Sequence, residues 1–236
     1  MEQKPTVIYI PGTLISPEVF RKIKTPEGFG EIRLSWMDAP GSHDVREVAK
    51  ALAGRIAAEG LGPVILAGHS SGGSIAMLTY LALKDRTRVG GMILSNTGAN
   101  NNGHSNQKSR EELIASWNYT ELDLFVRKCF KKPLDADMYE TLMGYGKTIS
   151  AEVRVEPLMS QREIDLSGRL PEITRPTVIA HGKLDTIRTL SHAEELSAGI
   201  PHAELVLLDA GHSPMYEDPD TWQAVLNRLA AQIMNP

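Results

Sequence analysis

The stretch Val64-Ile65-Leu66-Ala67-Gly68-His69-Ser70-Ser71-Gly72-Gly73 decides the fold of this 236-residue chain. Its first four residues are a continuous apolar run, which is typical of a strand buried on both faces of a parallel sheet. A glycine-rich turn follows, and residues 74–83 then have a helical pattern. A buried strand that turns at once into a helix predicts one unit of an α/β sheet.

The same alternation recurs on both sides of this stretch. Further apolar runs predict strands at residues 6–10, 32–36, 92–95, 177–180 and 205–208. Apolar residues at helical spacing predict helices at residues 45–59, 190–197 and 221–233. We therefore predict an α/β fold with a doubly wound, mostly parallel sheet.

The alternation breaks in residues 99–170, where helical patterns are separated by polar loops and no good strand occurs. Asn100-Asn101-Asn102-Gly103 opens this segment and Pro171 closes it. An all-helical insertion between two halves of one sheet is more typical of a lid than of an independent domain. We predict a core of residues 1–98 and 171–236, with residues 99–170 as a helical lid inserted between the two sheet halves.

Composition excludes several classes of protein. The 25 Lys and Arg residues against 29 Asp and Glu leave a net charge of −4, so a fold-wide basic surface for nucleic acid is absent. The single cysteine, Cys129, cannot close an intrachain disulfide. No apolar run approaches the roughly 20 residues of a membrane span, and the first one is too short for a secretion signal. We predict a cytoplasmic protein that binds neither nucleic acid nor membrane.

The turn Gly68-His69-Ser70-Ser71-Gly72 matches the pattern G-x-S-x-G, in which the central serine is a nucleophile on a strained turn between a strand and a helix. Its glycines allow the strand and the helix to approach each other without a Cβ clash. The start of the helix offers free N–H groups to developing negative charge. No Lys-Ser/Thr pair follows, which argues against a phosphate-binding P-loop. Ser70 is therefore the predicted nucleophile.

A serine nucleophile needs a base, and the chain has seven histidines. His212 lies just after the last predicted strand, at the carboxyl edge where open α/β sheets bind ligands, so it is the predicted base. His69 is held inside the turn, and His181 is expected to shape the turn after its strand. His43 falls in a turn and is expected in solvent. His104 lies at the start of the insertion, where it can touch a substrate.

The third member of the triad is a carboxylate that orients the histidine. Asp185 follows the penultimate predicted strand and precedes His212, which gives the chain order Ser, Asp, His. Asp209 is the alternative, but it lies only three residues before the histidine and can equally cap the turn. We predict Asp185.

The oxyanion of the tetrahedral intermediate needs two N–H donors. One is the backbone N–H of Ser71, the residue after the nucleophile. The other is expected in the loop after the first strand, where Gly12 allows a tight turn. Thr13 is our choice there, with Leu14 as the alternative.

Together these motifs resemble the α/β-hydrolase superfamily, and specifically its small, lidded carboxylesterase-like and lactonase-like members. Ile10-Pro11-Gly12-Thr13 stands where the family usually has a His-Gly oxyanion loop, and Asp38-Ala39-Pro40-Gly41-Ser42 resembles its Asp-x-Pro-Gly-His-Gly turn. Gly182-Lys183-Leu184-Asp185 and Gly211-His212 stand at its acid and histidine loops. Pro11 replaces the customary histidine, which is expected to change the packing of the loop rather than the chemistry.

The resemblance implies a serine hydrolase, without cofactor or metal, that cleaves a small, largely apolar carboxylic ester or lactone through an acyl-enzyme on Ser70. The same triad serves thioesterases, acyltransferases and enzymes that hydrolyse a carbon–carbon bond next to a ketone. A binding protein that has lost turnover is the alternative from another class. The expected partner is a small-molecule ester, lactone or thioester substrate.

The insertion contributes little to this prediction. Its aromatic and methionine side chains can line an acyl pocket, but most are expected in its own core. The basic run of residues 127–132 is expected to be a solvated helix face rather than a site for an anionic substrate tail. Cys129 lies within that run. It is not on a strand-to-helix turn like that of Ser70 and has no adjacent histidine, so it is not expected to be a nucleophile.

Overall fold

The computed structural model describes residues 4–102 and 108–234. Within these residues, six strands form a single sheet in the order β2-β1-β3-β4-β5-β6, and every neighbouring pair is parallel. The strands are β1 (Thr6–Ile10), β2 (Gly30–Arg33), β3 (Val64–His69), β4 (Val89–Ser95), β5 (Thr177–Gly182) and β6 (Glu204–Leu208). The predicted α/β fold with a parallel sheet is confirmed, and each predicted strand overlaps an observed one.

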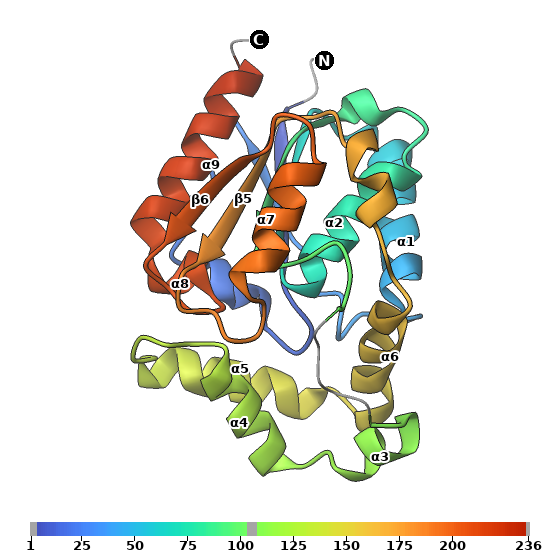
Figure 1. Cartoon of the computed structure of the whole chain (residues 1–236), viewed down its shortest axis with the longest axis vertical. Coiled ribbons are helices and arrows are strands. Elements are labelled where there is room, and N and C mark those ends of the chain that lie inside the picture. The colour runs from blue at the N-terminus through green and yellow to red at the C-terminus, as the bar shows by residue number, and fades with distance from the viewer. Residues whose placement is uncertain (1–3, 103–107, 235–236) are drawn as a thin grey trace.

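Helices cover both faces of the sheet, with α9 on one side and α1 and α2 on the other (Figure 1). The helices outside the insertion are α1 (Val45–Ala58), α2 (Ser71–Ala82), α7 (Leu190–Gly199), the short α8 (Pro214–Glu217) and α9 (Pro219–Met234). No helix in the described parts of the chain combines the length and apolarity needed to cross a membrane.

Alternate residues of each strand face opposite sides of the sheet, as strand geometry requires. In β1, Ile8 and Ile10 join the core cluster that contains α1, α2 and α7, whereas Val7 and Tyr9 join the cluster that contains α9. All four side chains are fully buried, which explains why β1 has a continuous apolar sequence.

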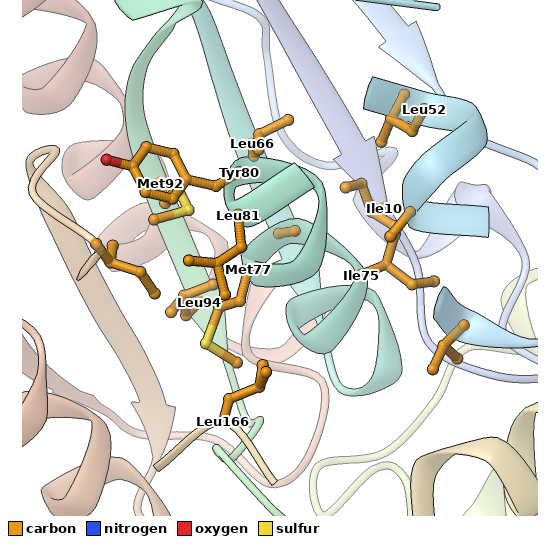
Figure 2. Close-up of a cluster of buried hydrophobic side chains, with 14 of the residues drawn as sticks. Ile10, Leu52, Leu66, Ile75, Met77, Tyr80, Leu81, Met92, Leu94 and Leu166 are labelled. Carbon is orange, nitrogen blue, oxygen red and sulfur yellow. The ribbon is translucent and has the colours of Figure 1, made fainter. Parts of the chain in front are cut away.

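The helix α2 is buried along most of its length between the sheet and α1. Figure 2 shows Ile75, Met77 and Tyr80 of α2 among side chains from the strands, with Leu66 of β3 and Leu94 of β4 beside them. All five are at most 1% exposed. This packing fixes α2 against the sheet and thereby fixes the turn that precedes it.

The chain between β4 and β5 is helical. It forms α3 (Arg110–Ala115), α4 (Tyr119–Lys128), α5 (Ala136–Thr148) and α6 (Ala151–Arg162), and then the 3-10 turn η3 (Ser167–Glu172). In Figure 1, α4 and α5 lie on the side toward which the arrowheads of β5 and β6 point. The division into a core and a lid remains a prediction.

Each of the four helices of this segment begins at a polar cap, as helix propensities favour. Ser109, Asn118, Asp135 and Ser150 each accept a backbone N–H of the first turn through the side chain. Beyond an isolated bridge between residues 100 and 165, the described residues of the segment contain no β structure.

Candidate active site

Ser70 occupies a strained turn between β3 and α2. Its backbone has φ 54° and ψ −122°, a left-handed conformation that few residues other than glycine adopt. A Cβ on Gly68 would lie 2.4 Å from the carbonyl oxygen of Gly72, and one on Gly72 would lie 2.0 Å from that of Ile10. The Ser70 N–H donates to the carbonyl of Ser95 on β4 at 2.9 Å. These backbone contacts therefore allow only glycine two residues before Ser70, at Gly68, and two residues after it, at Gly72.

The turn lies where the order of the strands changes direction. The chain passes from β1 to β2 on one side and later returns to β3 on the other side of β1. A Cβ on Gly12, in the loop after β1, would lie 3.0 Å from Cβ of Ser70. The carboxyl ends of the strands at such a change of direction are where open α/β sheets bind ligands.

His212 and Asp185 form a buried pair at the same edge. The distance from His212 Nδ1 to Asp185 Oδ2 is 2.7 Å, and the side chains are 4% and 0% exposed. The amide of Asn96 donates to the same carboxylate oxygen at 2.6 Å. The other oxygen, Oδ1, accepts the backbone N–H groups of Ile187 at 2.7 Å and Arg188 at 3.1 Å. Both carboxylate oxygens are satisfied, which fixes the imidazole with Nδ1 toward the acid.

The surroundings of Asp185 keep this carboxylate ionised. Burial by itself raises its pKa, but the hydrogen bond and charge of His212 and the hydrogen bonds from Asn96 and Ile187 outweigh burial and lower the pKa to about 2. A charged acid beside Nδ1 stabilises an imidazolium at His212.

His69 connects the serine turn to the histidine loop. Its Nε2 lies 2.8 Å from the carbonyl oxygen of His212, and the two rings are 5.0 Å apart. Complete burial, with repulsion by His212, lowers the pKa of His69 to about 3, so this ring is neutral and donates to the carbonyl. Within the described residues, no hydrogen bond joins Ser70 Oγ to His212, which is common in unliganded active sites.

The two predicted oxyanion donors contact each other. The Thr13 N–H donates to Ser71 Oγ at 2.7 Å, and the two hydroxyl oxygens are 2.9 Å apart. Both residues are buried. Ser71 is the first residue of α2, so its own N–H has no acceptor inside the helix. The N–H of Thr13 is therefore hydrogen-bonded to the hydroxyl of Ser71. Leu14, the alternative oxyanion donor, has a backbone φ of 63°, which is strained for a residue other than glycine.

The remaining acid and base candidates lie elsewhere. Asp209 is 72% exposed and pairs with Lys132 at 3.0 Å. His181 is buried at the end of β5, where burial lowers its pKa. His43 is buried rather than solvated, which corrects the expectation from sequence, because Ala39 and α6 enclose it. His104 lies outside the described residues.

Asn96 is a residue of the site that sequence reasoning missed. Besides Asp185, its amide nitrogen contacts the carbonyl of Gly211 at 3.1 Å, and its amide oxygen accepts the N–H of Gly182 at 3.2 Å. Asn96 thus connects the loops that carry the acid and the histidine. Its place directly after β4, at the carboxyl edge, is the signal that could have identified it.

Two aromatic residues of the insertion contribute to the packing of the hydrophobic core. Trp117 and Phe125 are partly buried and pack against both core clusters. Cys129 is fully buried, and burial raises its pKa, so the thiol is unreactive. Across residues 4–102 and 108–234, no group of three or more His, Cys, Asp or Glu side chains could hold a metal ion.

A family model described as the alpha/beta hydrolase family matches residues 25–224 of the chain. The chain is also similar to the AB hydrolase superfamily protein YisY of Bacillus subtilis (strain 168), with 28% identity over 182 residues. That match covers 72% of this chain and 66% of the relative, slightly less than two thirds of its length.

Two solved structures have a similar fold. An esterase from Exiguobacterium antarcticum superposes with a TM-score of 0.82 and 21% identity, covering 100% of this chain and 94% of that one. The enol-lactonase from Burkholderia xenovorans LB400 superposes with a TM-score of 0.80 and 18% identity, covering 97% and 92%. At these identities the likeness extends to the fold.

Proposed function

The chain belongs to the alpha/beta hydrolase family, and from this premise we propose that it is a serine hydrolase that cleaves a small, largely apolar carboxylic ester or lactone. The proposal rests on one observation, the buried pair of Asp185 and His212, 2.7 Å apart, at the sheet edge that also carries the strained Ser70. The esterase and enol-lactonase of similar fold support this substrate class.

In the proposed reaction, Ser70 Oγ attacks the carbonyl carbon of the substrate while His212 Nε2 removes the hydroxyl proton. Asp185 keeps the proton on Nδ1 and stabilises the imidazolium that forms. The strained turn presents the serine at the end of β3, and the residue there is half-buried rather than fully enclosed.

The tetrahedral oxyanion is held by the backbone N–H groups of Ser71 and Thr13. The Thr13 N–H first exchanges its bond to Ser71 Oγ for one to the substrate oxygen, because that hydroxyl occupies it in the free protein. Each such donor stabilises the transition state by about 3 kcal/mol. The start of α2 adds a favourable dipole at the same point.

Collapse of the intermediate breaks the bond between the carbonyl carbon and the leaving oxygen, and His212 gives its proton to that oxygen. An ester releases an alcohol, whereas a lactone leaves a hydroxyacyl chain on Ser70. His212 then activates a water molecule, which attacks the acyl-enzyme and releases the carboxylic acid. A thioester would follow the same steps with a thiol as the leaving group.

The insertion, residues 99–170, is proposed to act as a lid that bounds the acyl pocket. Trp117 and Phe125 are partly buried aromatic side chains of the insertion that pack against both core clusters, so they are the candidates to contact the acyl chain. Substrates with an apolar acyl group should therefore react faster than polar ones of the same size.

A fluorophosphonate probe tests the proposal, because it labels serines that are activated as nucleophiles. Labelling should occur at Ser70, disappear in Ser70→Ala, and persist in Ser109→Ala, a serine that caps a surface helix. Turnover of matched esters, lactones and thioesters with the same acyl group would then identify the leaving group. A folded protein that is not labelled would instead be a binding protein.

A further inference from the structure

Glu217, the last residue of α8, holds the loop that carries His212 from both sides of the histidine. Its Oε2 accepts the backbone N–H of Gly211 at 3.0 Å and that of Ser213 at 3.3 Å. The residue is 9% exposed. A single carboxylate oxygen thus bonds the two residues that flank His212.

The other oxygen of the same carboxylate bonds the insertion. Oε1 of Glu217 accepts the N–H groups of Lys131 at 2.6 Å and Lys132 at 2.8 Å, in the loop that follows α4. This segment also packs against the histidine loop, since a Cβ on Gly211 would lie 2.6 Å from Cγ of Lys131. The carboxylate therefore lies between the insertion and the histidine loop and contacts both.

This arrangement uses the full capacity of the carboxylate. A carboxylate has about four lone-pair sites, and here four backbone N–H groups bond to Glu217. N–H bonds to a charged oxygen are stronger than those between neutral groups. A glutamine at this position would turn an N–H₂ group, a donor, toward two of the four N–H donors. The contact therefore requires the carboxylate itself.

We propose that Glu217 is a positioning residue that joins the His212 loop to the insertion, so that a displacement of the insertion is transmitted to the base. The inference rests on the proposed function, in which His212 is that base. It assigns the insertion a second role, since the segment that bounds the acyl pocket also places the imidazole. Glu217 acts through the backbone of residues 211 and 213 and does not touch the reacting atoms.

The variant Glu217→Gln tests this role, with Glu172→Gln as the matched control. Glu172 also accepts hydrogen bonds, but from two arginines on the surface. The rate at which the fluorophosphonate labels Ser70 should fall by about 10- to 100-fold in Glu217→Gln, because a small displacement of a base has an effect of that size. Glu172→Gln should label at the wild-type rate, although both variants lose a carboxylate.

Hydrogen exchange separates positioning from a merely local loss of stability. In Glu217→Gln, the amides of residues 131 and 132 and those of residues 211 and 213 should exchange faster together. In the wild-type protein, labelling of Ser70 should change the exchange of both segments in the same direction. The second measurement needs no variant, so it tests the inference even if Glu217→Gln fails to fold.

The outcomes distinguish the inference from the proposed function. If the folded wild type is not labelled, the proposed function fails and the inference fails with it. If the wild type is labelled, an unchanged labelling rate in Glu217→Gln overturns the inference alone. A response to labelling at residues 211 and 213 without one at residues 131 and 132 would also overturn it.

Discussion

The edge of the sheet and the helical insertion beside it are built by different kinds of contact. At the edge, the backbone of the turn at Ser70 is fixed by close approaches such as that of Gly72 to Ile10, and the carboxylate of Asp185 is fully buried. In the insertion, helices begin at surface caps, and Leu124 of α4 is 57% exposed. The catalytic groups that we propose are thus positioned by the sheet, whereas the insertion that we propose as a lid is built from helices that leave apolar side chains such as Leu124 exposed.

The largest expected effect belongs to the nucleophile. Ser70→Ala should lower kcat/KM by about 10⁶-fold, because the attacking oxygen is removed. The melting temperature should stay close to that of the wild type, since the turn is held by backbone contacts and not by the hydroxyl. Turnover of an activated ester, together with thermal unfolding, checks both expectations. Full activity in this variant would place the reaction elsewhere in the molecule.

Substitution of the two candidate acids should change kcat to very different extents. Asp185→Asn should lower kcat by about 10⁴-fold, because an amide at this position holds His212 in the wrong tautomer. Asp209→Asn should change kcat only a few-fold, because this side chain is largely exposed and pairs with Lys132. Parallel kinetics on the two variants decide between them, and a greater loss in Asp209→Asn would reverse the assignment.

Two glycine substitutions compare the rigidity of the two regions. Gly72→Ala should lower the free energy of unfolding by about 3 kcal/mol or more, because its Cβ meets backbone that cannot move. Gly144→Ala, in the exposed middle of α5, should raise it by up to about 1 kcal/mol, because a Cβ there meets no atom within 4 Å. Denaturant unfolding measures both. Equal effects of the two variants would show that the regions do not differ in this way.

The free energy of unfolding should also depend on pH, because buried groups of the site titrate. In the folded protein the pKa of His69 is lowered to about 3, whereas in the unfolded chain this histidine has an ordinary pKa of about 6.5. As the pH falls, the unfolded chain therefore binds the proton first. The free energy of unfolding should therefore fall as the pH drops below about 6.5, by up to about 1.4 kcal/mol per pH unit. Asp185 adds a further loss between about pH 4 and pH 2, because its folded pKa is lowered to about 2.

Denaturant unfolding at a series of pH values, with His69→Gln for comparison, isolates this group. The glutamine does not titrate and can still donate to the carbonyl of His212. The slope between about pH 6.5 and pH 5 should be shallower in this variant. An identical slope in the two proteins would show that His69 is not the group that titrates.

Strands buried on both faces are readily predicted from sequence, because every position is apolar. β1 is observed at the predicted residues, Thr6–Ile10. β2 is observed at Gly30–Arg33 rather than at residues 32–36, because the chain leaves the sheet and Trp36 turns inward to donate to the carbonyl of Pro11 at 2.9 Å. That contact joins distant segments and leaves no local pattern.

In the candidate site, too, sequence predicts the positions that follow strands but not the contacts between distant segments. Ser70, Asp185 and His212 each follow a strand, so the topology of the sheet by itself places them at one edge. The bond from the Thr13 N–H to the hydroxyl of Ser71 depends on side-chain positions across 58 residues of chain, and no sequence pattern signals it. The four N–H bonds to Glu217 are of the same kind. Local patterns predict elements and edges, but not the contacts that join them.

If the serine, the histidine and the acid act as one unit, their losses should not multiply. We would measure kcat/KM on an activated ester for His212→Ala, Asp185→Asn and the double variant. The double variant should be as slow as His212→Ala alone, because the acid acts through the histidine. A double variant slowed by the product of the two single losses would contradict the triad, because the acid would then act independently of His212.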